Sequence, residues 1–321
     1  MKTITQFISQ SKKLLIIVAE LPLKESQFVQ NFLIQCNCPM IIEPLSQLRN
    51  TPELQPKISN DNTLKITQFT HVLRLGGMPV TSLWRQLAKQ PTIHTLSVSH
   101  LPFNGLPHGQ LITSDYTNLK GSCQQVLPNQ NWRISRQKTI DQTPNSEPHM
   151  IDHLSRHIPN NAIIYLGNSS PIRTWGSYAS YTNNSFQIYA SRGVNGIDGQ
   201  LSTFLGIASP KIENWCILGD LTTLYDLSAP WILPQLAQFT LRIVIINNHG
   251  GQLFAEKFPN HPELINTHNI DFDHWAALWK IKITTITDIT TLNQHQWEKH
   301  HIIVLKPQKY PTTHTLDLTQ P

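Results

Sequence analysis

The sequence predicts an α/β protein with two domains, each a doubly wound parallel sheet covered by helices on both faces. Short runs of Val, Ile and Leu recur along the chain without polar alternation, as in strands that are buried on both faces. Helical stretches or long crossovers separate these runs, which is the spacing that parallel strands require. The length of 321 residues favours two domains, each large enough to bury its own core.

The first domain is expected over residues 1–127. Residues Lys24–Gln35 have helical spacing, which predicts a helix with Phe28, Phe32 and Leu33 on one face. The expected strands are Leu14–Glu20, Pro39–Glu43, His71–Gly76, Ile93–Ser99 and Gln110–Asp115.

Residues 128–148 are polar, with a proline near each end and no hydrophobic period, so we interpret them as the connection between the domains. The second domain is expected over residues 149–321 and repeats the alternation of strands and helices. Helices are predicted near His149–His157, Gly199–Ala208 and Asp271–Lys280. Strands are predicted at Ala162–Gly167, Phe186–Ala190, Cys216–Gly219, Arg242–Asn247, Lys282–Thr285 and Ile302–Leu305.

Composition excludes several classes of protein. The formal charge is +5, but the basic residues form no Lys/Arg run, so nucleic-acid binding is not expected. No apolar run is long enough to cross a membrane, and the polar first residues lack a signal-peptide pattern, which favours the cytoplasm. The four cysteines, Cys36, Cys38, Cys123 and Cys216, contain no zinc-type pair and are expected to be reduced, mostly buried thiols.

Polar residues follow two apolar strands in the segment 216–254. One strand ends at Gly219 and Asp220, and the next ends at Asn247 and Asn248. Open parallel sheets bind ligands at the carboxyl ends of their strands. Asp220 offers an anionic oxygen, Asn248 a neutral one, and a backbone carbonyl just after Asn248 a third. Mg²⁺ takes such oxygens together with phosphates and water, so the pattern predicts a metal–diphosphate site.

The spacing of these residues resembles a known signature. A Gly-Asp pair followed by Asn-Asn is typical of thiamine-diphosphate (ThDP) enzymes at the separation found between Asp220 and Asn248, which is 248 − 220 = 28 residues. The segments GNSSPIR, SRGVNGIDGQLST, GDLTTLYDL and NNHGGQLF together resemble one family, the 2-succinyl-5-enolpyruvyl-6-hydroxy-3-cyclohexene-1-carboxylate (SEPHCHC) synthases of menaquinone biosynthesis. The resemblance is strong over residues 161–256. It extends more weakly through the first domain, where LRLGGMPVTSLW is similar to that family's central domain.

The resemblance implies that the second domain is a ThDP-binding domain of the diphosphate-binding (PP) type. It assigns the metal, Mg²⁺ or Mn²⁺, to Asp220, Asn248 and the carbonyl of Gly250. Ser169, Arg173 and Arg192 are implied at the reaction site, where planar guanidinium groups suit small substrates with carboxylates. The residues implied to bind the cofactor are Asn168, Gly196, Ile197, Asp198, Gly199, Gly219, Asp220, Leu221, Thr222, Asn248, Gly250, Leu253 and Phe254.

Each of these residues also has a purely structural interpretation. Asp220 and Thr222 suit the start of a helix, and the two asparagines suit a turn. The arginines suit surface ion pairs, and Leu253 and Phe254 suit a core. His249 stands where the family commonly has Asn, and we interpret it as a bystander.

Two departures from the family pattern affect the functional prediction. The family's activating glutamate lies on a pyrimidine-binding domain that precedes everything matched here, and none of Glu20, Glu25, Glu43 or Glu53 has its context. We therefore expect that domain on a separate chain, in a heterotetramer with two chains of each kind, although a homodimer of this chain alone could survive purification. Ser82 stands where family members often carry a substrate-contacting Lys, which leaves substrate recognition open.

Three functional hypotheses follow. The first is the diphosphate-binding subunit of a split SEPHCHC synthase, in which 2-oxoglutarate is decarboxylated and its four-carbon remainder is added to isochorismate. The second is a catalytically inactive remnant or module that still binds ThDP. The third is a ThDP-dependent decarboxylase or ligase that acts on other 2-oxo acids.

Overall fold

A computed structural model describes residues 2–125, 127, 130–181, 185–193 and 196–308. The chain forms two compact units, Met1–Arg136 and Gln137–Pro321. The division falls inside residues 128–148, which we interpreted as a connection. That segment is largely helical, because α4 (Asn131–Gln142) occupies most of it. A polar helix of this kind has no apolar stripe, so periodicity gives no signal for it.

The sheet of the first unit has five parallel strands in the order β3-β1-β4-β5-β6. All five were predicted from the sequence, with ends that agree to within a few residues. Their bounds are β1 Leu14–Val18, β3 Met40–Ile42, β4 His71–Leu75, β5 His94–Ser99 and β6 Gln110–Thr113. Central β1 is completely buried, which explains its unbroken run of Leu, Ile and Val.

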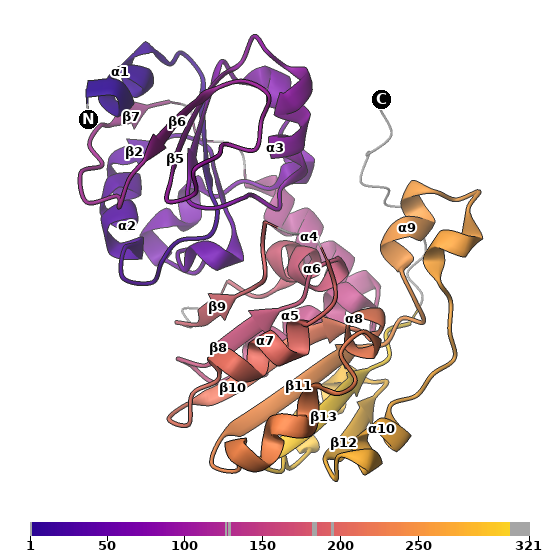
Figure 1. Ribbon diagram of the computed structural model, residues 1–321. Helices are drawn as coiled ribbons and strands as arrows, with labels where there is room; N and C mark the ends of the chain where they lie inside the picture. The colour runs from indigo at the N-terminus through magenta and orange to yellow at the C-terminus, as the bar shows by residue number, and fades with distance from the viewer. Residues whose placement is uncertain (1, 126, 128–129, 182–184, 194–195, 309–321) are drawn as a thin grey trace. The chain divides into compact units, whose positions relative to one another are not determined.

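Three α-helices and five short 3-10 helices accompany this sheet (Figure 1). The α-helices are α1 (Lys2–Gln10), α2 (Ser26–Gln35) and α3 (Ser82–Gln86). The 3-10 helices are η1 Pro44–Ser46, η2 Pro52–Lys57, η3 Asp61–Thr63, η4 Ile66–Gln68 and η5 Leu87–Lys89. The prediction for α2 was wrong in one respect: Val29, Phe32 and Leu33 are buried, whereas Phe28 is exposed because it lies beside the buried stripe.

A separate pair of parallel strands joins β2 (Cys36–Asn37) to β7 (Cys123–Gln124). It places Cys36 opposite Cys123. All four cysteines of the chain are free and buried, as predicted.

The second unit contains six parallel strands in the order β12-β13-β11-β10-β8-β9. The predicted strands are all present, and β10 and β11 begin earlier than predicted. Their bounds are β8 Ile163–Leu166, β9 Gln187–Tyr189, β10 Glu213–Gly219, β11 Thr240–Ile246, β12 Lys282–Ile286 and β13 His300–Leu305. Both sheets are parallel throughout, so the predicted α/β fold with two parallel sheets is confirmed.

Helices cover both faces of the second sheet (Figure 1). On one face α7 (Gln200–Ile207), η6 (Ala229–Leu236) and α10 (Asp273–Leu278) pack on alternate residues of β8, β10, β11 and β13. On the other face lie α5 (Glu147–His157), α6 (Ser170–Tyr178) and η8 (Ile289–Gln294), and His157 of α5 contacts Trp215 of β10. The remaining elements are α8 Asp220–Leu224, α9 Gln252–Lys257 and η7 Pro262–Ile265.

The strand order fixes where a ligand can bind. From β8 the chain first moves outward to β9 and then returns past β8 to form β10. The connections after β8 and β10 therefore leave in opposite directions, which opens a crevice at the carboxyl ends of these two strands. Residues 167–169 follow β8 and Asp220 follows β10.

Candidate metal and cofactor site

Asp220 lies at the end of β10, as the first residue of α8, and is only 2% exposed. Its Oδ1 accepts a hydrogen bond from the backbone N–H of Leu221 at 2.6 Å. Its Oδ2 accepts one from the backbone N–H of Gly250 at 2.9 Å. The structure thus joins the two strand ends that the sequence analysis singled out, since Gly250 belongs to the loop after β11.

His268 is a further neighbour of Asp220. Its Nε2 lies 3.3 Å from Oδ2 of Asp220, yet this buried nitrogen makes no well-aligned hydrogen bond. His249, which we interpreted as a bystander, lies beside it, with Nδ1 3.2 Å from the backbone oxygen of His268. Sequence reasoning missed His268 because no motif surrounds it and it follows Asp220 by 268 − 220 = 48 residues.

The loop after β11 is held in an unusual backbone conformation. His249 has φ 64° and Gly250 has φ 125°, both in the left-handed half of the map. A Cβ on Gly250 would lie 2.7 Å from the oxygen of Ile265 and 2.9 Å from that of Asn266. Only glycine fits this position, and the tight approach keeps the Gly250 backbone against Asp220.

Asn248 is anchored by a side chain that the sequence analysis did not consider. Its Nδ2 donates to Oε2 of Glu147 at 3.2 Å, and its backbone oxygen accepts from Nε2 of Gln252 at 3.1 Å. The neighbouring Asn247 is buried and donates to the backbone oxygen of Ile270.

Asn168 organises the end of β8. It is 1% exposed, and its Nδ2 donates to the backbone oxygens of Ser191 at 2.9 Å and Gly196 at 2.8 Å. Its Oδ1 accepts from Nη1 of Arg192 at 2.7 Å. Its backbone N–H donates to Oε1 of Gln200, whose Nε2 donates to Gly196. Asn168 therefore ties three candidate segments together, and Gln200 is a member of this network that sequence reasoning missed.

Ser169 and Arg173 form the second part of this strand end. Ser169 has φ 72° and ψ −128°, a region that residues other than glycine rarely occupy. Arg173, on the first turns of α6, donates through Nη1 to the backbone oxygen of Ser169. Backbone strain of this kind concentrates at functional sites, where the surrounding structure enforces it.

The remaining candidates lie around this centre in the same unit. Thr222 is buried in α8, and Leu221 and Gly219 are half-buried beside it. Gly196, Asp198 and Gly199 are exposed and Ile197 is half-buried, whereas Val194 and Asn195 of the same motif lie outside the described residues. On α9, Leu253 is half-buried and Phe254 is 40% exposed, with its ring stacked 6.4 Å from that of Phe258. The structure leaves the functional roles of all these residues as predictions.

The donor set fits a hard divalent cation. Within the described residues, no group of three or more His, Cys, Asp or Glu side chains is arranged to hold a metal. A metal here would therefore rest on one carboxylate, that of Asp220, together with neutral oxygens of Asn248 and Gly250. Such oxygen sets suit Mg²⁺, which completes its octahedron with phosphates and water. The buried carboxylate of Asp220 accepts two backbone N–H bonds but faces the imidazole of His268 without an aligned bond. A cation at this place would therefore stabilise its charge further.

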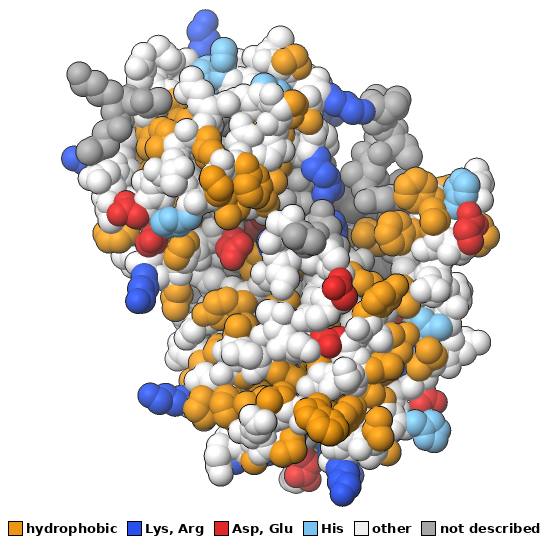
Figure 2. Space-filling view, viewed as in Figure 1, with side chains coloured by type: hydrophobic (Ala, Val, Ile, Leu, Met, Phe, Trp, Pro, Cys, Tyr) orange, Lys and Arg blue, Asp and Glu red, His pale blue; other side chains and the backbone are white. Residues whose placement is uncertain are grey.

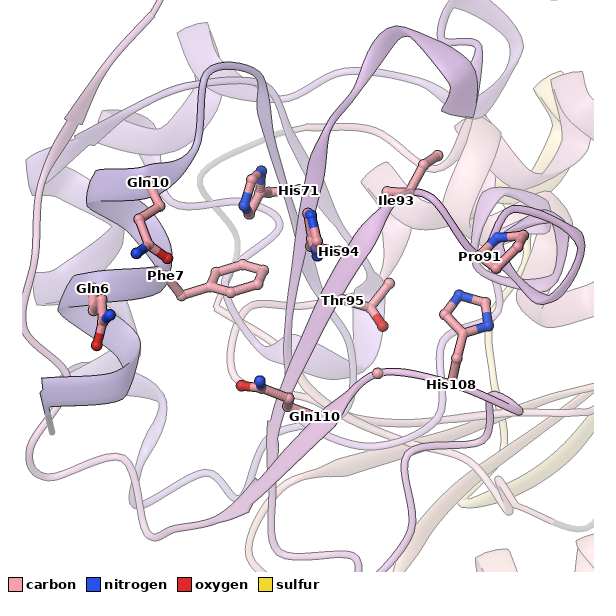
Figure 3. A pocket seen from close by; sticks show the side chains of 11 residues that line it. Gln6, Phe7, Gln10, His71, Pro91, Ile93, His94, Thr95, His108 and Gln110 are labelled. Carbon is pink, nitrogen blue, oxygen red and sulfur yellow. The ribbon is translucent and has the colours of Figure 1, made fainter.

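A pocket of about 490 Å³ lies in the first unit, whereas the residues above belong to the second (Figure 3). His71 and His94, the first residues of β4 and β5, line it with rings 4.9 Å apart, and Phe7 of α1 meets His71 edge-on. Burial, and then the neighbouring His94, lower the pKa of His71. The pocket lies at the amino ends of the strands, opposite the edge where parallel sheets bind ligands. We therefore do not assign it to the cofactor.

The fold and the contacts together define a parallel α/β protein with a cluster of buried and half-buried polar residues at the carboxyl ends of its second sheet. No protein-family model matches the chain. Curated proteins do match it, and among them the SEPHCHC synthase of Bdellovibrio bacteriovorus is 35% identical over 325 residues, which cover 96% of this chain and 61% of that protein. The synthase of Akkermansia muciniphila is 29% identical over 87% of this chain and 56% of its own length. That of Shewanella frigidimarina is 25% identical over 88% of this chain and 54% of its own length.

The predicted resemblance is confirmed, and the chain is a homologue of the SEPHCHC synthases along nearly all of its length. It spans only 54% to 61% of the length of these three relatives. No helix among the described residues has the length and apolar character needed to cross a bilayer.

Proposed function

We propose that this chain is the diphosphate-binding part of a ThDP-dependent SEPHCHC synthase. It would act on 2-oxoglutarate and isochorismate together with a pyrimidine-binding domain. The observation that supports this most directly is the bond from Gly250 to Asp220. This hydrogen bond joins the ends of β10 and β11, and the end of β10 borders the crevice of the second sheet. The curated relatives of the chain are SEPHCHC synthases.

In this proposal the chain holds the metal and the diphosphate, and the cofactor supplies the electron sink for decarboxylation. Asp220, Asn248 and the Gly250 carbonyl hold Mg²⁺ or Mn²⁺. Arg173 lies on α6 and Arg192 follows β9, and each donates a hydrogen bond to a residue just after β8, Ser169 and Asn168 respectively. Their guanidinium groups suit the carboxylates of the two substrates. Asn168 fixes Arg192, so its guanidinium group is positioned before substrate arrives.

The test is binding of ThDP by calorimetry, with Mg²⁺ or Mn²⁺ present and with both absent, in the presence of the partner domain. Asp220→Ala should abolish metal-dependent binding, because the only carboxylate of the proposed metal site is lost. Asp220→Asn, which preserves the shape of the side chain, should weaken it strongly. Asp273→Ala, an exposed aspartate in the first turn of α10, is the matched control and should bind normally. Equal affinity with and without Asp220 would overturn the metal assignment.

A further inference from the structure

Glu147 makes an unusual set of contacts for a residue at the start of a helix. It is the first residue of α5, after the N-cap Ser146, where a carboxylate is favoured by the helix dipole. Its Oε1 accepts hydrogen bonds from Oγ of Ser170 at 2.9 Å and Oγ1 of Thr174 at 2.6 Å, one turn apart on α6. Its Oε2 accepts the bond from Nδ2 of Asn248 at 3.2 Å. One carboxylate thus connects α5, α6 and the loop after β11.

These contacts determine which way the amide of Asn248 faces. An ionised carboxylate only accepts hydrogen bonds, so the NH₂ group of Asn248 must be the side that meets Glu147. A reversed amide would place its oxygen against the carboxylate oxygen, two acceptors with no proton between them. The Oδ1 of Asn248 is therefore directed to the opposite side of the amide, and it is the atom that a cation requires.

We infer that Glu147 is a positioning residue, which sets the orientation of the Asn248 amide and so presents its oxygen to the metal. The inference rests on the proposed function for the identity of that metal. The two hydroxyl donors on α6 hold the carboxylate in place, so Ser170 and Thr174 support the same arrangement. Outer-shell partners of this kind commonly change metal affinity about 10- to 100-fold when they are removed.

The first test measures Mn²⁺ affinity by electron paramagnetic resonance, with ThDP in excess and the partner domain present. Glu147→Ala should weaken Mn²⁺ binding about 10- to 100-fold. Glu147→Gln should weaken it less, because the amide oxygen can still accept one hydrogen bond from Asn248. The double variant Ser170→Ala/Thr174→Ala should fall between the wild type and Glu147→Ala, since it frees the carboxylate without removing it. Unchanged affinity in Glu147→Ala, with normal binding by the wild type, would overturn the positioning role and leave the proposed function standing.

The second test needs neither metal nor cofactor. Asn248→Asp places a carboxylate against Glu147, so the Tm of the metal-free chain should fall by several degrees. In a Glu147→Gln background the same substitution should lower the Tm much less, because the repulsion is gone. Additive effects in this double-mutant cycle would show that the two side chains do not interact, and would refute the inference. Clear coupling in the cycle combined with no Mn²⁺ binding by the wild type would instead support the Glu147 contact and reject the proposed metal site.

Discussion

At the scale of single residues, side chains from distant parts of the chain hold several candidate residues in place, as Glu147 does for Asn248 and Gln200 for Asn168. The pattern of strand ends singled out Asp220 and Asn248, which the structure brings to one crevice. It did not single out Glu147, Gln200 or His268, each of which contacts one of the candidate residues. These partners come from distant parts of the chain and carry no local motif, so only the folded arrangement reveals them.

Arg192 offers a direct test at this scale. Its Nη1 donates a hydrogen bond to Oδ1 of Asn168, so the planar guanidinium group is held near the end of β8. Arg192→Lys should lower kcat/KM for the 2-oxo acid on the order of 10-fold or more, because an ammonium group cannot reproduce two parallel bonds to a carboxylate. Steady-state kinetics of the complete assembly would measure this. Arg156→Lys, which alters a partly exposed arginine paired with Asp152 on α5, serves as the control. Unchanged kinetics for Arg192→Lys would contradict a substrate contact.

His301 predicts a pH dependence of stability. This residue of β13 is buried, its Nδ1 accepts from the backbone N–H of Glu298, and its Nε2 lies 2.9 Å from Oγ1 of Thr284. Burial, and then the nearby positive charges of Arg242 and Lys282, lower the pKa of His301 to about 4 from an ordinary value of 6.5. The unfolded chain therefore binds the proton of this histidine more readily than the folded chain does. The stabilisation that neutral His301 contributes is complete above about pH 6.5 and is lost as the pH falls towards 4.

The expected loss from this histidine is about 1 to 2 kcal/mol between about pH 7 and pH 5. Urea unfolding at the two pH values would measure it. His301→Gln removes the titrating group and should reduce the difference between the two pH values, whatever its effect on absolute stability. An equal difference in the variant would show that other groups cause the pH dependence.

At the scale of elements, hydrophobic runs predicted the strands of both large sheets, and the sequence pattern predicted the helices α2, α5, α7 and α10. The strands of both large sheets carry short apolar or β-branched runs, which are buried in β1, β8 and β11 and partly exposed in β6, β9 and β12. The sequence analysis missed α1, α3, α4, α6 and α9. The residues of α1 appear mostly polar, with Ile4 and Ile8 as buried anchors at helical spacing, and α4 has no regular apolar stripe. Local sequence patterns do not predict such helices, because contacts with distant residues stabilise them.

The loop after β11 gives a prediction about an element. Gly250→Ala would place a Cβ against two backbone oxygens at a backbone angle that alanine disfavours, which should destabilise the second unit by about 2 kcal/mol or more. The same change should disturb Asp220, whose Oδ2 accepts from the Gly250 N–H. Thermal unfolding and ThDP binding would measure both effects.

Gly206 is the matched control for Gly250. It lies in α7, and no atom is within 4 Å of the place where its Cβ would be. Gly206→Ala should therefore be neutral or stabilise the chain by up to about 1 kcal/mol. Equal stability of the two variants would show that the loop after β11 adapts to a side chain.

At the scale of the whole molecule, the chain combines two parallel α/β units but spans only 54% to 61% of the length of the three relatives described above. Part of the second unit's surface is apolar near the proposed site (Figure 2). Phe254 on α9 is 40% exposed, Phe258 just after that helix is 43% exposed, and Leu264 in η7 is 45% exposed. Such a patch is typical of a surface that another protein covers. In the proposed function, this patch is the surface that the pyrimidine-binding domain covers.

The last prediction is that these 321 residues are inactive alone and become active with a pyrimidine-binding domain. The reason is chemical: by the family resemblance the activating glutamate belongs to that domain, and no glutamate here has its context. Glu43, for example, is buried and accepts the backbone N–H groups of Val80 and Thr81, so it is part of the first unit's own scaffold. Decarboxylation of 2-oxoglutarate should be assayed with ThDP and Mg²⁺, first with this chain alone and then with a separately expressed pyrimidine-binding domain of a relative.

Activity should appear only in the mixture, together with a larger species in analytical ultracentrifugation that fits two chains of each kind. The Asp220→Ala chain mixed with the same domain should stay inactive, which separates catalysis by this site from any contaminating enzyme. Phe258→Asp should weaken association, because it places a charge in the apolar patch on α9. Robust turnover by the chain alone would show that the missing glutamate is unnecessary or present. Association without turnover would instead favour a ThDP-binding module that has lost catalysis, because Arg173, Arg192 and the metal residues would then be present without a reaction.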